Sequence, residues 1–299
     1  MKKILILGVT GMLGSTVYDV LSKNIDFDVR GTARNPKDFT LRKNGKIYSF
    51  DAETDNIKLK VFSDFVPDYI INCIGIIKPY CKDNDPQGIL RAIKVNALFP
   101  YLLVSSTQEI KAKVIQIATD CVYSGTKGKY TEKSQHDALD VYGKTKSLGE
   151  VQADNFLNIR CSIIGPELKN KTSLLEWFLS RKSGEKLTGF THHLWNGVST
   201  LQFAKLCHEI IKRGENYFSD LTKKSYIYHY TPNVAVSKYE LLNIFKKVFK
   251  KDVMIEEVGG PGPAVDRTLS TDFVVFTDNN GTKPMEYAIE ELYEYMTKR

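Results

Sequence analysis

The first half of the chain alternates short apolar runs with longer amphipathic stretches. Between the first two runs, Leu13, Val17 and Leu21 recur at every fourth position, which places them on one face of a helix. Runs rich in Val, Ile and Leu with helices between them are typical of parallel strands covered on both faces. We therefore predict an α/β fold built on a Rossmann-type doubly wound parallel sheet. The expected strands are residues 3–7, 28–33, 47–50, 69–73, 114–118 and 157–164, and the expected helices include 93–110 and 143–153.

The alternation loosens after residue 166, which predicts a smaller second domain. The aromatic run at 225–231 has the pattern of a strand, so segments near 196–231 are expected to rejoin the main sheet. We place the first domain at 1–166 and the second at 167–299, with a boundary that the sequence leaves open. Helical patterns in the second domain lie at 174–181, 201–213, 238–249 and 286–297.

Three glycines stand between the first strand and the first helix. Gly8, Gly11 and Gly14 follow the spacing GxxGxxG. Glycines in such a turn let the backbone approach a pyrophosphate, whose charge then lies at the positive end of the following helix. A glycine triplet alone is a weak signal, but its place between an apolar strand and an amphipathic helix predicts a dinucleotide site. The other residues assigned to this turn are Thr10, Met12 and Leu13.

The end of the second strand discriminates between NAD and NADP. Arg34 stands there, and a guanidinium can pair with a 2′-phosphate, whereas an acidic residue would bind a ribose 2′-hydroxyl. We therefore favour NADPH as the cofactor and keep NADH as the alternative. Asp51, after the third strand, is expected either to bond an adenine amino group or to cap its own loop. Further cofactor contacts are expected from Ala52, Cys73, Ile74 and Gly75.

Tyr142 precedes Lys146 by four residues in the segment DVYGKTKSLGE. Residues four apart on a helix face the same way, so the two side chains can act together. With 16 tyrosines and 42 Lys plus Arg among 299 residues, chance alone gives roughly two such pairs. A rival pair is Tyr123 and Lys127, but a glycine between them indicates a loop, which would not hold the side chains together.

These motifs occur in an order that resembles the extended short-chain dehydrogenase/reductase family, and within it the dTDP-4-dehydrorhamnose reductase-like sugar-nucleotide reductases. The resemblance implies a nucleotide-binding fold followed by a small domain that binds the sugar nucleotide. The matching segments are GVTGMLG at 8–14, VNALFP at 95–100, ATDCVYSG at 118–125, YGKTKSLGE at 142–150 and NIRCSIIGP at 158–166, with weaker matches in NGVSTLQFAKL at 196–206 and DRTLSTDF at 266–273.

The resemblance implies that Thr119, Tyr142 and Lys146 are catalytic, with Asn96 in support. Reducing a ketone places negative charge on its oxygen, so a hydroxyl donor and a proton source lower the barrier. Tyr142 would supply the proton and Thr119 the second hydrogen bond. Lys146 would hold the nicotinamide ribose and lower the tyrosine pKa, which is expected to fall by about two to three units from its ordinary value near 10.

The residues after Thr119 separate related activities. Dehydratases of the family carry Asp-Glu there, whereas this chain has Asp120 and Cys121, so dehydration is disfavoured. We favour a reductase of the 4-keto group of a nucleotide-linked 4-keto-6-deoxy sugar. Enzymes resembling GDP-fucose synthase use a cysteine at this position with a histidine, and that histidine is missing after 158–166. An epimerase-reductase that uses Cys121 and a non-catalytic regulatory subunit stay as alternatives.

Three residues of the second half are candidate substrate contacts beside Cys121. Trp195 could stack on a base or sugar, or pack a domain interface. Asn196 could bond a sugar hydroxyl, and Arg267 a diphosphate, with a surface ion pair as the alternative. The nucleotide and the stereochemistry of the sugar cannot be read from these residues.

Composition narrows the class of protein. The net charge is +7, but the basic residues are scattered, and FKKVFKK at 245–251 is typical of a solvated helix face, so nucleic acid is not an expected partner. No apolar run reaches the ~20 residues that cross a bilayer.

The five cysteines form no CxxC pair and no metal-ligand spacing, which favours a reducing cytoplasm and no metal. Relatives often pair through the helices at 93–110 and 143–153, so a homodimer stays open.

Overall fold

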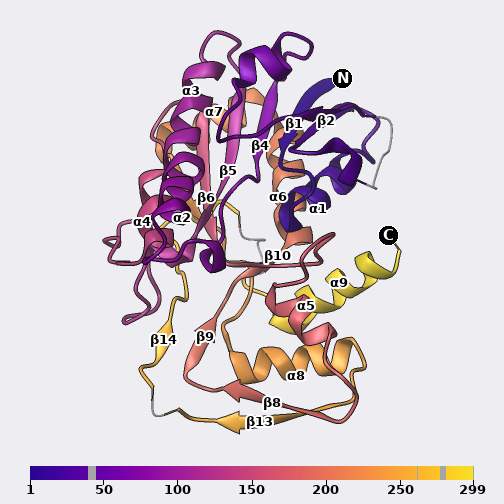
Figure 1. The fold of residues 1–299 in the computed structure, drawn as a ribbon, viewed down its shortest axis with the longest axis vertical. Coiled ribbons are helices and arrows are strands. Elements are labelled where there is room, and N and C mark those ends of the chain that lie inside the picture. The colour runs from indigo at the N-terminus through magenta and orange to yellow at the C-terminus, as the bar shows by residue number, and fades with distance from the viewer. Residues whose placement is uncertain (40–44, 261, 277–280, 299) are drawn as a thin grey trace.

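The computed structural model describes residues 1–39, 45–260, 262–276 and 281–298. Its centre, within these ranges, is a seven-stranded sheet in the order β11-β6-β5-β4-β1-β2-β3, with every neighbouring pair parallel (Figure 1). This confirms the predicted Rossmann-type α/β fold. The strands are β1 (Lys2–Leu7), β2 (Phe27–Ala33), β3 (Ile47–Ser49), β4 (Tyr69–Asn72), β5 (Lys113–Thr119), β6 (Phe156–Cys161) and β11 (Ile227–His229).

Both faces of the sheet are buried. In β1, Ile4 and Ile6 pack into one apolar cluster and Leu5 and Leu7 into another, because successive side chains of a strand point to opposite faces. The first cluster is covered by α1 (Met12–Leu21), α6 (Thr200–Arg213) and α7 (Glu215–Lys224). On the other side lie α2 (Pro86–Ala92), η4 (Ile93–Leu98), α3 (Phe99–Thr107) and α4 (Val141–Leu148) (Figure 1).

The direction of winding reverses between β1 and β4. β1 pairs with β2 on one side and with β4 on the other, and the chain crosses over the sheet to reach each of them. Ligands of open parallel sheets bind in the crevice at such a switch point, outside the carboxyl ends of the strands. Gly8 follows β1 and Cys73 follows β4, so both predicted loops lie at this crevice.

The remaining elements form a second, smaller group below the sheet in Figure 1. Their apolar core includes Phe178, Leu241, Phe245 and Ile289. That residues 167–299 form a substrate-binding domain stays a prediction. The elements are β7 (Ile163–Ile164), β8 (Glu185–Phe190), β9 (His193–Trp195), β10 (Val198–Ser199), β12 (Val236–Ser237), β13 (Val253–Val258), β14 (Val265–Asp266), α5 (Leu174–Leu179), α8 (Lys238–Val248) and α9 (Met285–Thr297).

Several elements differ from the sequence prediction. The expected strand at 157–164 divides into β6 and β7, and β7 pairs with β10 outside the main sheet. The expected helix at 143–153 starts earlier, because Asp140 caps it by accepting a hydrogen bond from the Gly143 N–H, and it ends before Gly149. Helix α7 and most short strands of the second group were not predicted. Short helical turns lie at η1 (Pro36–Asp38), η2 (Lys58–Phe62), η3 (Lys78–Tyr80) and η5 (Asp120–Val122).

One helical run, Pro86–Thr107, is long and apolar enough to cross a membrane by length and composition. The sequence analysis predicted that no such run exists. It missed this one because α2, η4 and α3 join without a break. Half of the apolar window of this run is buried inside the protein, as expected for a core helix.

Candidate active site

The glycine turn after β1 is as tight as its sequence predicts. Gly8 has φ of +82°, a left-handed conformation that glycine adopts without strain. A Cβ on Gly14 would lie 2.2 Å from the Gly8 carbonyl oxygen, so only glycine lets α1 pack against the turn. The Gly11 N–H donates to the same carbonyl at 3.0 Å. The turn therefore presents bare backbone at the start of α1, where a phosphate group could approach.

A pocket opens beside this turn at the switch point. It gathers residues that follow four different strands, including a pair that sequence reasoning missed, Glu53 and Arg91. Met12, Leu13 and Gly14 do not line it, because they belong to α1 behind the turn. The predicted cofactor residues that line the pocket are Gly8, Thr10, Gly11, Arg34, Asp51, Ala52, Cys73, Ile74 and Gly75.

The acidic residues at the pocket are already engaged. The Asp51 carboxylate accepts a hydrogen bond from the Glu53 N–H at 3.0 Å, which matches the loop-capping alternative rather than a free adenine ligand. Glu53 accepts a hydrogen bond from Arg91 Nε at 2.5 Å. That carboxylate is thus paired with Arg91, and Arg34 at the end of β2 lines the same pocket.

Asn96 connects three parts of the site. Its amide nitrogen donates to the Ile76 carbonyl at 3.0 Å, and its amide oxygen accepts from the Ile76 N–H at 2.8 Å. The same nitrogen also lies 3.3 Å from the Thr145 hydroxyl on α4. Asn96 thus holds the loop after β4 against the helix that carries Tyr142 and Lys146, which is a positioning contact.

Lys146 lies close to Gly75, which lines the pocket. Its Nζ donates to the Ile117 carbonyl of β5 at 3.2 Å, and a Cβ placed on Gly75 would lie 3.9 Å from this nitrogen. The side chain is 8% exposed, and burial lowers its pKa. Lys144, two residues earlier, is exposed as expected. Because Gly75 lines the pocket, Lys146 adjoins the space where the glycine turn and the β4 loop meet.

Tyr142 and Thr119 face each other across the end of β5. Burial raises the pKa of Tyr142, the nearby Cys121 thiol adds to the rise, and a hydrogen bond from Thr119 partly offsets it. The sequence argument expected a lowered pKa, and these side chains give the opposite direction because desolvation outweighs the contribution of Thr119. The Tyr142 phenol therefore holds its proton at neutral pH.

The turn after Thr119 places two further groups at the site. Thr119 caps η5 by accepting a hydrogen bond from the Cys121 N–H, and its hydroxyl lies 3.2 Å from the Asp120 carboxylate. Burial raises the pKa of Asp120, which sequence reasoning did not count as a site residue. Burial also raises the pKa of Cys121 to about 12. The Cys121 thiol is thus protonated at neutral pH.

Two expected substrate residues also make structural contacts. Asn196 uses both ends of its amide on the backbone of Leu269, donating to the carbonyl at 2.7 Å and accepting from the N–H at 3.0 Å. Its contact with a sugar hydroxyl, through the second N–H, stays a prediction. Trp195 is buried in the core of the second group, which corresponds to its packing alternative. Arg267 lies close to the site, and its Nε and Nη2 donate to the carbonyls of Tyr123 and Ser124.

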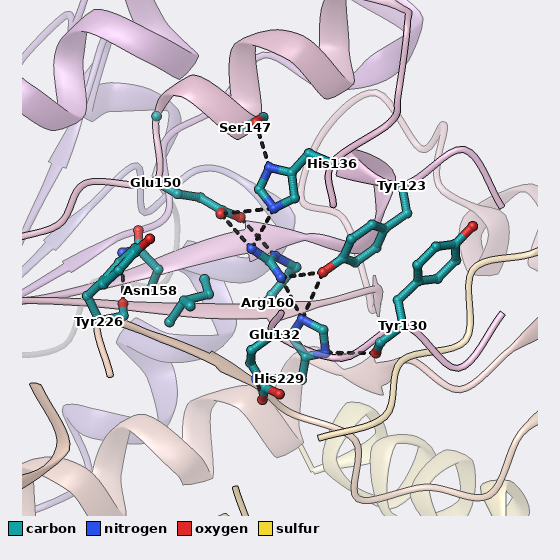
Figure 2. Close-up of polar contacts among 12 residues, drawn as sticks. Tyr123, Tyr130, Glu132, His136, Ser147, Glu150, Asn158, Arg160, Tyr226 and His229 are labelled. Carbon is teal, nitrogen blue, oxygen red and sulfur yellow. Dashed lines mark hydrogen bonds and ion pairs between the residues drawn. The ribbon is translucent and has the colours of Figure 1, made fainter. Parts of the chain in front are cut away.

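The rival tyrosine belongs to a buried cluster around Arg160, shown in Figure 2. All five guanidinium N–H groups of this arginine have an acceptor. Nε and Nη2 bind the two Glu150 oxygens at 2.9 and 2.6 Å, and Nη2 also reaches His136 Nε2 at 2.9 Å. Nη1 donates to Tyr123 Oη and to His229 Nε2, each at 2.6 Å. Tyr123 therefore packs in the interior, where its hydroxyl accepts a hydrogen bond from Arg160.

We call this group the arginine cluster: Arg160, Glu150, His136, Tyr123 and His229. It adjoins α4, the helix that carries Tyr142 and Lys146. Glu150 lies two residues beyond the end of α4, and His136 Nδ1 lies 2.6 Å from the Ser147 hydroxyl on that helix. The cluster thus fixes the end of α4 opposite to Tyr142. Sequence reasoning missed it because its members are far apart along the chain.

The described residues contain no group of three or more His, Cys, Asp or Glu side chains that could hold a metal ion. The sheet order, the glycine turn and the helix bearing Tyr142 and Lys146 together define a Rossmann-type α/β protein with a pocket at the switch point. The chain matches the family model described as RmlD substrate binding domain over residues 1–261, and it therefore belongs to that family. The resemblance seen in the sequence is confirmed at this level.

Two relatives to which the chain is similar have different functions in their names. Methionine adenosyltransferase 2 subunit beta of Bos taurus is 30% identical over 149 residues, which cover 50% of this chain and 42% of that protein. The chain thus spans about two fifths of the length of this relative. dTDP-4-dehydrorhamnose reductase of Aggregatibacter actinomycetemcomitans is 24% identical and aligns with 91% of this chain and 86% of that protein.

Among solved structures, dTDP-4-dehydrorhamnose reductase of Bacillus anthracis in complex with NADP superimposes with a TM-score of 0.73. It is 18% identical, and the superposition covers 99% of both chains. A likeness at this identity shows the shared fold, which extends over both groups of elements.

Proposed function

We propose that the protein is an NADPH-dependent reductase of the 4-keto group of a nucleotide-linked 4-keto-6-deoxy sugar, acting in deoxysugar biosynthesis. The observation that carries the proposal is the closeness of Lys146 to Gly75, which brings the helix of Tyr142 beside the glycine-turn pocket. A cofactor in that pocket and a ketone at Tyr142 would then be neighbours. The substrate class is supported by the family and by the likeness to dTDP-4-dehydrorhamnose reductase.

The residues of the chain suit the delivery of a proton to a ketone. Tyr142 keeps its proton because burial raises the pKa of its phenol, so it can donate as negative charge develops on the substrate oxygen. The hydroxyl of Thr119 lies beside it and offers a second hydrogen bond to the same oxygen. The Lys146 ammonium, held by the Ile117 carbonyl, would bind ribose hydroxyls.

The pocket fits a dinucleotide by its shape and donors. A Cβ at Gly8 or Gly14 would collide with neighbouring atoms. Because both residues are glycine, the backbone of the turn is open to a ligand. Arg34 at the end of β2 favours a 2′-phosphate, so NADPH is proposed ahead of NADH. When bound, the nicotinamide would supply the hydride.

The protonation state of Cys121 counts against the epimerase-reductase alternative. A thiol must be deprotonated to remove a proton from carbon, and burial raises the pKa of this one to about 12. We therefore propose that Cys121 contacts the substrate without acting as a base.

A second candidate function is that of a non-catalytic regulatory subunit. The observation that favours it is the likeness to methionine adenosyltransferase 2 subunit beta, named as a subunit of another enzyme. Such a role would need the pocket but would make no use of Tyr142.

One assay separates these candidates. NADPH oxidation is measured with dTDP-, UDP- and GDP-linked 4-keto-6-deoxy sugars, and we expect turnover with at least one. Replacing Tyr142→Phe should lower kcat by about 10²- to 10⁴-fold and leave NADPH binding unchanged. Tyr287→Phe, an exposed tyrosine of α9, is the matched control and should keep full activity. NADPH binding without turnover of any of the sugars would contradict the reductase and support the regulatory subunit.

We also propose that the protein is a cytoplasmic homodimer. Its five cysteines are all free, as a reducing compartment requires. Exposed apolar side chains gather on α3 and α4 and at the end of η4, and a second copy could cover them: Leu98, Tyr101, Leu102 and Leu148. Sedimentation at several protein concentrations should give a dimer, and replacing Leu102→Glu should give a monomer; a monomeric parent protein would refute this.

A further inference from the structure

Three buried amide side chains form a row across the main sheet, which we call the amide row: Asn72, Gln116 and Asn158. Asn72 of β4 pairs in register with Gln116 of β5, and Gln116 pairs in register with Asn158 of β6. Each stands two positions after a residue of the apolar cluster that contains Leu5 and Leu7, so all three point to the face that α3 covers. They are 2%, 3% and 0% exposed, and amides buried this deeply are costly unless they are hydrogen-bonded.

The middle amide, Gln116, is bonded on three sides. Its Oε1 accepts a hydrogen bond from Asn72 Nδ2 at 2.9 Å. Its Nε2 donates to the Gly149 carbonyl at 2.8 Å and to Asn158 Oδ1 at 3.2 Å. Asn72 Oδ1 in turn accepts from the Ile74 N–H at 3.2 Å. The amide row thus contains a continuous chain of hydrogen bonds that starts at Ile74 and ends at Gly149.

The backbone groups at the two ends fix the orientation of this chain. A carbonyl only accepts, so the nitrogen of Gln116 must face Gly149 and its oxygen must face Asn72. The oxygen of Asn72 must then face the Ile74 N–H, which only donates. Because each amide has one orientation that satisfies all its partners, the chain holds Ile74 and Gly149 at one separation.

The two ends of the chain belong to the two parts of the candidate active site. Ile74 lines the pocket, and its Cγ1 would lie 3.0 Å from a Cβ placed on Gly8, so its side chain lies against the glycine turn. Gly149 ends α4, and a Cβ placed on it would lie 1.9 Å from the Asn96 carbonyl oxygen. The chain therefore ties the pocket to the end of the helix that carries Lys146.

Resting on the proposed function, we propose that Gln116 is a positioning residue, which sets the distance between Lys146 and the cofactor pocket. Lys146 donates to the carbonyl of Ile117, the residue after Gln116, so the ammonium and the amide are held by the same stretch of β5. Gln116 is not among the described residues that line the pocket, and its effect passes through α4. A displacement of about 1 Å of a group at the reaction centre can lower the rate by about 100-fold.

The test begins with Gln116→Met, which keeps the length of the side chain and removes its hydrogen bonds. With the sugar nucleotide that the protein reduces, kcat should fall by about 10- to 100-fold, and the KM of the sugar nucleotide should stay unchanged. NADPH affinity, measured by fluorescence titration without sugar nucleotide, should fall by about 3- to 10-fold, because Lys146 would no longer reach the ribose hydroxyls.

A second variant breaks the same chain at its other link. Asn72→Leu should give the same losses of kcat and NADPH affinity as Gln116→Met. The double variant should lose no more than either single variant, because two breaks in one chain do not add.

Asn158→Leu is the matched control, because it removes equally buried hydrogen bonds that lead away from the pocket. Asn158 Nδ2 donates to the Val151 carbonyl at 2.9 Å and to the Tyr226 carbonyl at 3.0 Å (Figure 2). Urea unfolding should show a similar loss of stability in Asn158→Leu and in Gln116→Met. In Asn158→Leu alone, kcat and NADPH affinity should keep the parent values.

The outcomes separate this inference from the function on which it rests. Equal changes of kcat and NADPH affinity in Gln116→Met and Asn158→Leu would mean that the amide row contributes stability only, and would overturn the inference. Parent values in Gln116→Met would overturn it as well. If Gln116→Met does not fold, the comparison of Asn72→Leu with Asn158→Leu decides in the same way. If the parent protein binds NADPH but reduces none of the sugar nucleotides, the proposed function fails, and the NADPH affinities of the variants still decide for or against Gln116.

Discussion

Arg160 Nη1 lies 2.6 Å from His229 Nε2, and this contact fixes the charge of the histidine. An arginine can only donate, so Nε2 must accept and carries no proton. His229 Nδ1 lies 2.7 Å from the Ser270 carbonyl, which can only accept, so the single proton is on Nδ1. His229 is therefore neutral, and its burial and the arginine charge lower its pKa to about 4.

The first prediction concerns stability at low pH. Because the pKa of His229 is below the ordinary 6.5 in the folded chain, the unfolded chain takes up a proton first as pH falls. The contribution of His229 is complete above about pH 6.5 and is lost toward pH 4, by about 3 kcal/mol. Urea unfolding between these pH values should show a steeper loss for the parent protein than for His229→Gln, which cannot titrate. Equal losses of unfolding free energy in the two proteins would count against a lowered pKa of His229.

The second prediction concerns the charge of Arg160 itself. Arg160→Met leaves the Glu150 carboxylate buried without a cation, and the free energy of unfolding should fall by about 3–5 kcal/mol. The matched control is Arg213→Met, which removes an exposed ion pair with Glu209 and should cost less than about 1 kcal/mol. Urea unfolding at pH 7 measures both. A similar cost for the two variants would mean that the arginine cluster contributes no more than a surface pair.

The third prediction concerns the glycine turn. Gly14→Ala places a Cβ 2.2 Å from the Gly8 carbonyl oxygen, so α1 must move away from the turn. We expect a loss of about 1–3 kcal/mol in unfolding free energy and weaker NADPH binding. Gly262→Ala is the control, because its Cβ meets no atom within 4 Å. Thermal melting and NADPH titration give both quantities, and unchanged NADPH affinity in Gly14→Ala would argue against a cofactor at this turn.

The fourth prediction concerns the choice of cofactor. Arg34→Ala should weaken NADPH binding by about 10- to 100-fold and leave NADH binding nearly unchanged, because only NADPH carries a 2′-phosphate. Arg91→Ala, which breaks the ion pair with Glu53 in the same pocket, is the informative control and should not discriminate between the cofactors. Equal losses for both cofactors in Arg34→Ala would sink the assignment of NADPH.

Local signals in the sequence predicted the main sheet and the helix of Tyr142. The apolar run of β1 and the four-residue spacing from Tyr142 to Lys146 depend on neighbours in the chain, so they can be read without a structure. The small strands of the second group, such as the two residues of β12, are too short to carry a pattern. Their pairing depends on the fold around them.

Distant partners explain what the sequence did not reveal at the site. Asn196 has its backbone partner Leu269 73 residues away. Glu53 meets Arg91 across 38 residues. In each case the function of a polar side chain is set by what the fold brings beside it, which spacing along the chain does not reveal.

The arginine cluster also has a consequence for the order in which the chain folds. Tyr123 and His229 are 106 positions apart, and Arg160 must meet both. A guanidinium that leaves water before its acceptors arrive pays a large desolvation cost, so its burial must wait until the long loop has closed. We expect the β6–β11 edge of the sheet to dock late and in one concerted step, and partly folded chains to keep a hydrated arginine where the native protein has its interior.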